Sequence, residues 1–165
     1  MAISHGRGLT REETQGLSRH ADGRVERCGF GCWLAQECET GRTIGYVGIS
    51  VPTFFPAILP AVEVGWRFDP TVWGRGYAVE GARAALDQSF TTLGLDEVCS
   101  LPHAHNPRSL RVAEGLGMRM VREVLIPANA RRGEVLATFF VITKAEWLAG
   151  RPVSPTRGRR GHTQA

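Results

Sequence analysis

The segment Trp73-Gly74-Arg75-Gly76-Tyr77-Ala78 has the composition of an anion-binding loop. The hydrophobic pattern predicts a strand before it and a helix after it. Backbone N–H groups at a helix N-terminus attract anions, and glycines let a phosphate approach the backbone closely. The P-loop pattern of nucleotide hydrolases is excluded because no Lys-Ser or Lys-Thr follows, and the Rossmann pattern fails because Val79 occupies its third small position. An ordinary strand-to-helix turn is the remaining alternative.

The spacing of cysteines and histidines argues against a metal centre. The four cysteines contain no C-x-x-C pair; they are Cys28, Cys32, Cys38 and Cys99. On one strand, Cys32 and Cys38 would lie roughly 20 Å apart at ~3.3 Å per residue, too far to share a metal ion or a disulfide. His103 and His105 add too few ligands beside Cys99. We therefore expect no metal site, and cysteines that stay reduced.

The predicted elements alternate as in an α/β protein with a mixed sheet. A first helix is expected over 10–27, where Thr10 and Glu13 form a capping box. The other expected elements are strands at 31–38, 43–50, 61–68, 97–101, 118–126 and 135–143, helices from the glycine loop to about 92 and at 106–116, and a last helical turn at 144–148. The strand at 61–68 alternates, with Val62, Val64, Trp66 and Phe68 on one side and Glu63, Gly65 and Arg67 on the other.

Length and charge indicate one domain, over residues 1–149, followed by a basic tail at 150–165. The chain has 165 residues and a formal charge of +4, and the tail alone carries four arginines and no acid. The body is therefore close to neutral, which makes a nucleic-acid-binding role unlikely, and the tail is expected to be disordered. No apolar run is long enough for a membrane span and no apolar leader is visible, so we predict a cytoplasmic protein.

Three segments taken together resemble the GNAT family of acetyl-CoA-dependent N-acetyltransferases. The stretch Trp73 to Gly81 is similar to the Trp-Gly-[Lys/Arg]-Gly-Tyr-Ala-x-Glu-[Ala/Gly] signature of the branch that contains the ribosomal-protein N-terminal acetyltransferases. It is preceded by Val62-Glu63-Val64-Gly65-Trp66 and followed by Asn106-Pro-Arg-Ser109 with Gly115-Leu-Gly117-Met118, both typical of the family. The resemblance covers about residues 29–148.

The resemblance implies a GNAT-like fold and acetyl transfer from acetyl-CoA to a primary amine by direct attack. The cofactor diphosphate would lie on the N–H groups of residues 74–78, with Arg75 as an added charge, and the pantetheine arm along the backbone of Trp66, Arg67 and Phe68. Asn106 would orient that arm. The implied cofactor-binding residues are thus Trp66, Arg67, Phe68, Gly74, Arg75, Gly76, Tyr77, Ala78, Asn106 and Ser109.

Two side chains are candidates for the chemistry that the resemblance implies. Glu63 is the candidate general base, acting through water. The alternative for Glu63 is a structural carboxylate that faces either solvent or an arginine. The alternative for the base is His103 or His105. Many relatives place a tyrosine seven residues after the asparagine as the acid for the leaving thiolate, but that place is Ala113 here. Ser109 is the substitute candidate, with helix capping or cofactor positioning as its other readings.

The resemblance also leaves a gap at the N-terminus. The family begins with a strand and a helix before the helix expected at residue 10, and residues 1–8 are too short for both. We therefore expect strand 31–38 to be an exposed edge and the acceptor side to be incomplete. This keeps a second class open, a catalytically impaired CoA-binding or interaction module. The acceptor amine can be a protein N-terminus or a small amine, and a homodimer is a candidate assembly.

Overall fold

The structure is a computed structural model that describes residues 29–128 and 133–150. The predicted helix at 10–27, Cys28 and nearly all of the basic tail lie outside the described residues. In the described ranges no helix has the length and apolar character needed to cross a bilayer.

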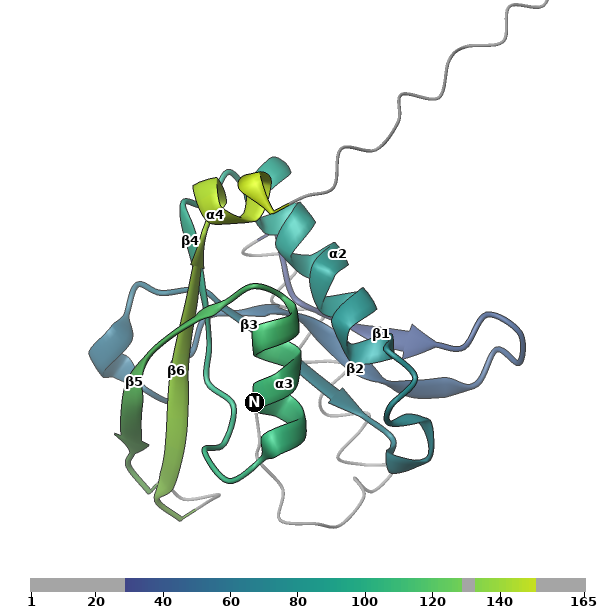
Figure 1. The fold of residues 1–165 in the computed structure, drawn as a ribbon, viewed down its shortest axis with the longest axis horizontal. Helices are drawn as coiled ribbons and strands as arrows, with labels where there is room; N and C mark the ends of the chain where they lie inside the picture. Colours follow the sequence, from purple (N-terminus) through teal and green to yellow (C-terminus); the bar gives the residue numbers. More distant parts are fainter. Residues whose placement is uncertain (1–28, 129–132, 151–165) are drawn as a thin grey trace, which may run out of the picture.

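The described strands form one mixed sheet with the order β1-β2-β3-β4-β6-β5 (Figure 1). They are β1 (Cys32–Gln36), β2 (Thr43–Ser50), β3 (Glu63–Phe68), β4 (Glu97–Ser100), β5 (Arg119–Ile126) and β6 (Val135–Thr143). The pair β3–β4 is parallel and the other pairs are antiparallel. This confirms the predicted α/β class with a mixed sheet, and β2 and β6 have the predicted ends.

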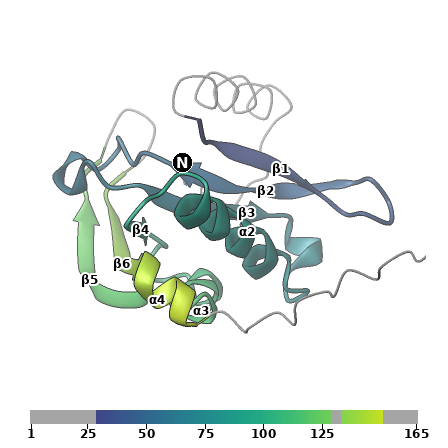
Figure 2. The ribbon, with the colours of Figure 1, turned by 90° about the horizontal axis from the view of Figure 1, so that it is seen from above.

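The helices α2 (Tyr77–Thr91), α3 (Pro107–Gly115) and α4 (Lys144–Ala149) lie on one face of the sheet (Figure 2). Ala82, Ala85 and Leu86 of α2 are fully buried against Val47 and other apolar side chains of the strands. Gly81 is needed at this contact because an added Cβ would lie 2.7 Å from a methyl carbon of Val47. The close approach of α2 to β2 and β3 fixes where the helix begins relative to the sheet.

The sheet divides between β3 and β4. The two strands share one register pair, Glu63 with Cys99, after which they separate. Strands β1 to β3 form one arm and β4, β6 and β5 form another, at a steep angle to the first in Figure 1. A parallel pair that stays together would continue its ladder, so the separation leaves backbone groups of β3 without a strand partner on that side.

Two apolar clusters hold the arms. The larger lies under the helices and includes Phe90, Ile142 and Trp147. The smaller is formed by the loop 52–60, which contains η1 (Pro56–Ile58), against β5 and β6, with Phe55 and Ile126 at its centre. The predicted hydrophobic side of β3 is confirmed, since Val64 is fully buried in the larger cluster and Val62, Trp66 and Phe68 pack against it.

Candidate functional site

The glycine loop connects η2 (Pro70–Val72), just after β3, to the start of α2. Gly74 and Gly76 have φ values of +80° and +84°, in the left-handed region that glycine adopts without strain. An added Cβ at either position would meet no atom within 4 Å. The glycines are therefore required by backbone conformation, and the space beside them is open to a ligand.

The start of α2 supplies N–H donors to this open space. Gly76 is the N-cap and has no side chain with which to cap the helix. The first backbone bond of the helix runs from the Glu80 N–H to the Gly76 carbonyl, so the N–H groups of Tyr77, Ala78 and Val79 have no partner within the helix. Together with the positive end of the helix dipole, they form a site suited to a phosphate group.

Trp73 fastens the beginning of the loop to the strand. Its indole N–H donates to the carbonyl of Phe68 at 2.9 Å. The guanidinium of Arg108, from the first turn of α3, lies 4.7 Å from the centre of the Trp73 ring. Trp73 thus connects β3, the loop and α3.

Glu37 holds the other end of the loop. Its carboxylate accepts from the Tyr77 hydroxyl at 3.1 Å and pairs with Arg75 at 3.4 Å. The Thr40 hydroxyl donates to its second oxygen at 2.8 Å. The hydrogen bonds from Thr40 and Tyr77, helped by the charges of Arg42 and Arg75, lower the pKa of Glu37 from its ordinary value, so the carboxylate is charged at neutral pH.

The register of β3 decides which backbone groups face the gap between β3 and β4. The Asp69 N–H donates to the Ile44 carbonyl. Backbone groups alternate along an antiparallel strand, so Arg67 and Gly65, two and four positions before Asp69, also bond to β2. Arg67 therefore turns its backbone groups toward β2. Trp66 and Phe68 turn theirs the other way, toward the gap, where the Phe68 carbonyl is used by Trp73.

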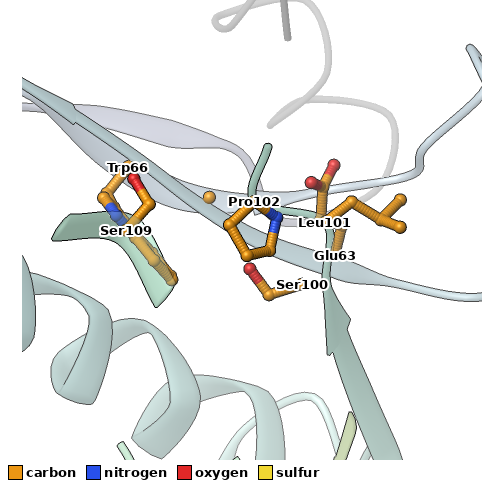
Figure 3. A pocket seen from close by; sticks show the side chains of 7 residues that line it. Glu63, Trp66, Ser100, Leu101, Pro102 and Ser109 are labelled. Carbon is orange, nitrogen blue, oxygen red and sulfur yellow. The ribbon is translucent and has the colours of Figure 1, made fainter. Parts of the chain in front are cut away.

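A pocket with an empty volume of about 220 Å³, part of it open to solvent, lies in the gap. Figure 3 shows its lining, which comes from β3, from the end of β4 and from α3. The lining residues are Glu63, Gly65, Trp66, Ser100, Leu101, Pro102 and Ser109. The structure thus brings together the two side chains predicted to be catalytic, Glu63 and Ser109, which are 46 positions apart.

Glu63 is buried, with 2% of its surface exposed. The alternative of a carboxylate that faces solvent is therefore wrong. Burial, and then the charge of Glu63, raise the pKa of the neighbouring Cys99 thiol to about 12. A thiol with this pKa stays protonated at neutral pH and is a poor nucleophile. The cysteine nearest the pocket is consequently unsuited to carry an acyl group.

Ser109 and Asn106 share the start of α3. The side-chain Oδ1 atom of Asn106 accepts from the Ser109 N–H at 3.2 Å, which makes Asn106 the N-cap. The Ser109 hydroxyl is not the capping group, because its residue lies at the third helical position and lines the pocket. Ala113 is fully buried in the core, which leaves no hydroxyl at the place where many relatives carry tyrosine.

The histidines lie beside the pocket rather than in its lining. The Nδ1 atom of His103 accepts from the His105 backbone N–H at 3.1 Å, and His103 forms a bridge with Ala137 of β6. Within residues 29–128 and 133–150, no group of three or more potential metal ligands occurs, and Cys32, Cys38 and Cys99 are not in disulfides.

Sequence reasoning missed several residues that shape the site. Glu37 and Arg108 contact the glycine loop from 38 and 35 positions away. Arg108 lies within segment 106–109, but the resemblance gave a role only to Asn106 and Ser109 there. Ser100, Leu101 and Pro102 were assigned to a strand end and loop, without a role in the site. The sequence analysis used Trp73 only as part of the branch signature and did not anticipate its contacts with Phe68 and Arg108.

Comparison with known proteins agrees with this geometry. Residues 3–119 match the family described as an acetyltransferase (GNAT) domain. The chain is 35% identical over 140 residues to the FsC-acetyl coenzyme A-N(2)-transacetylase of Aspergillus fumigatus, covering 79% of this chain and 57% of that protein. It is 35% identical over 96 residues to YkkB of Bacillus subtilis, covering 58% and 55% of the two chains. The chain spans a little over half the length of these relatives.

A solved structure supports the same assignment. The crystal structure of an acetyltransferase from Agrobacterium tumefaciens is 30% identical and superposes with a TM-score of 0.64, covering 83% of this chain and 74% of that one. The sequence match to the family spans well over half of the chain. The chain therefore belongs to the GNAT family of acetyltransferases.

Proposed function

We propose that this protein transfers an acetyl group from acetyl-CoA to a primary amine by direct attack of the amine on the thioester. The observation that carries the proposal is the pocket between β3 and β4, whose lining includes both Glu63 and Ser109 and which lies beside the edge of β3 that turns away from β2. The glycine loop lies at the start of α2, where a phosphate-bearing cofactor would need it. The acetyl-CoA named in the Aspergillus relative supports the same donor.

The described residues fit acetyl-CoA. The open space beside Gly74 and Gly76 would receive the diphosphate, with donors from the backbone of residues 74–78. The N–H groups of Trp66 and Phe68 face the gap, where they would pair with the pantetheine arm and with the carbonyl oxygen of the thioester. The backbone groups of Arg67 face β2, so they would not bond to the cofactor. Arg67 would only hold its neighbours Trp66 and Phe68 in the strand.

Bound acetyl-CoA supplies an acyl group activated as a thioester. The amine must lose a proton, since an α-amine has a pKa near ~8 and a lysine near ~10.4. Glu63 would accept that proton through water, as the buried carboxylate of the pocket lining. The amine nitrogen then forms its bond to the carbonyl carbon, the carbon–sulfur bond breaks, and the electron pair leaves with the sulfur.

Ser109 is the proposed donor to the departing sulfur. Its residue lines the pocket, and no tyrosine is available at position 113. Thiols have a pKa near ~8.5, so the thiolate needs little acid assistance and a hydroxyl is sufficient to stabilise it. The products are the N-acetyl amide and CoA; the sulfur takes up a proton equivalent to the one that the nitrogen loses as the amide forms, and Ser109 donates a hydrogen bond while keeping its own proton. An acyl-cysteine step is not part of the proposal, because the Cys99 thiol is buried and protonated.

A CoA-binding module without catalysis is the second candidate, and the buried Ala113 in place of the family's acid is the observation that favours it. A panel of amines separates the two. The purified full chain is incubated with acetyl-CoA and with a polyamine, an amino sugar or an N-terminal peptide, and CoA release is followed with a thiol reagent. Amine-dependent release supports transfer. Saturable binding of acetyl-CoA with no release for any amine supports the binding module.

A further inference from the structure

We propose that Glu37 is a positioning residue for the diphosphate loop: from the β1–β2 hairpin it holds Arg75 and Tyr77 so that the N–H groups around Gly76 face the cofactor. This inference rests on the proposed function. Glu37 lies outside the three segments on which the family resemblance was based, and the fold brings it to the glycine loop from 38 positions away.

The hairpin gives Glu37 a fixed place. Its backbone N–H donates to the Arg42 carbonyl at 2.9 Å, and its carbonyl accepts from the Gly41 N–H at 2.8 Å. The Thr40 hydroxyl fixes one carboxylate oxygen. Contacts within the hairpin thus hold the backbone and one side-chain oxygen of Glu37. They offset the loss of side-chain conformational entropy, so little further entropy is lost when Glu37 contacts the glycine loop.

The remaining carboxylate oxygen bridges the two residues that flank Gly76. Oε1 accepts from the Tyr77 hydroxyl and pairs with the Arg75 guanidinium. The Glu37 side chain is 14% exposed, whereas that of Arg75 is 58% exposed, so the shielded partner is the carboxylate. A loop with two glycines has many accessible conformations, and a charged contact on each side of Gly76 restricts them.

A second contact from the same hairpin supports this role. Arg42 donates to the Thr71 hydroxyl at 3.4 Å, and Thr71 is itself held by Asp69 through its N–H and its hydroxyl. The hairpin turn therefore contacts the connection between β3 and α2 at its beginning and at its end. An exposed turn remote from the pocket acts as the support for the segment that would bind the diphosphate.

The test compares Glu37→Ala with Glu39→Ala in the full chain. Glu39 carries an exposed carboxylate two positions away, so Glu39→Ala removes the same charge from the same turn. Isothermal titration with CoA is expected to give a Kd about tenfold higher for Glu37→Ala, the size of effect that loss of a charge-assisted contact brings, and an unchanged Kd for Glu39→Ala. Dephospho-CoA keeps the diphosphate, so its affinity should fall by the same factor.

Two further readouts separate positioning from general destabilisation. Tyr77→Phe should weaken CoA binding in the wild-type background and have little further effect in Glu37→Ala, because both substitutions remove the same hydrogen bond between Tyr77 and Glu37. Without cofactor, trypsin should cleave after Arg75 faster in Glu37→Ala than in Glu39→Ala, as followed by mass spectrometry. If the wild type binds CoA and Glu37→Ala binds it equally well, the positioning role is refuted while the proposed function stands. If the wild type binds no CoA, both fall.

Discussion

Substitution of Gly76 by glutamate tests the diphosphate site in the most direct way. The residue has a φ of +84°, and an added Cβ meets no atom within 4 Å. The protein therefore accommodates the new side chain sterically, and the cost is that of a non-glycine residue in the left-handed region, about 1–2 kcal/mol. A carboxylate at the start of α2 recovers part of this, about 0.3–1 kcal/mol, through the helix dipole.

Binding, in contrast, should be lost. A ligand at a hundred times its Kd stabilises the native state by ~2.7 kcal/mol. At ~2–4 °C per kcal/mol for a chain of this size, wild-type protein should melt ~5–11 °C higher with acetyl-CoA than without. In Gly76→Glu, bulk and negative charge occupy the space where a phosphate would lie, so the shift should be absent while the apo protein still unfolds cooperatively.

Gly94 offers a matched control. It also has a positive φ, +68°, and open space at its Cβ, but it follows α2 at the opposite end. A helix of 15 residues is about 22 Å long, so Gly94→Glu adds the same charge and a similar strain far from the loop. Differential scanning fluorimetry of both variants, with and without acetyl-CoA, decides the matter. A full ligand shift in Gly76→Glu, or its loss in both variants, would refute the assignment of the diphosphate to this loop.

Three other predictions follow from the structure. Glu63→Gln should lower turnover by about a hundredfold at pH 7 and by less at pH 9, where the amine deprotonates unaided; an equal loss at both pH values in initial-rate assays would indicate a positioning role. Cys99, whose pKa is raised by burial to about 12, should resist a thiol reagent at pH 8 in the native protein. Above pH 9 the folded state keeps the thiol proton while the unfolded state loses it, so Cys99 should lower the free energy of unfolding as the pH rises from 9 toward 12. Urea titrations of wild type and Cys99→Ala that show equal pH slopes in this range would contradict this. Thr143→Ala removes the side-chain half of the α4 capping box and should cost about 1 kcal/mol in urea denaturation, whereas an unchanged midpoint would show that α4 is held by Trp147 alone.

Much of the local structure follows from the sequence because its causes are local. Alternation in residues 61–68 predicted that Val64 would face the core and Glu63 the other side, and each was found there. The glycines at 74 and 76 predicted a loop that leads into a helix, and the structure has this loop, with both glycines in the left-handed region. Backbone conformation and side-chain periodicity depend on residues a few positions apart, so a linear pattern carries them. The assignment to the ribosomal-protein branch and the roles of the individual site residues remain predictions.

What depends on strand order could not be predicted. The pocket lies where β3 and β4 separate after one register pair, and it is closed by Ser109 from α3, which is distant in the sequence. Glu63, paired with Cys99 in the register, and Ser109 line one pocket because of that division. Glu37 reaches Arg75 and Tyr77 because the β1–β2 hairpin ends beside the loop. Contacts between residues some 40 positions apart leave no periodic signal in a single sequence; the sequence by itself determined the loop and its helix, and the tertiary structure decided what holds them and what faces them.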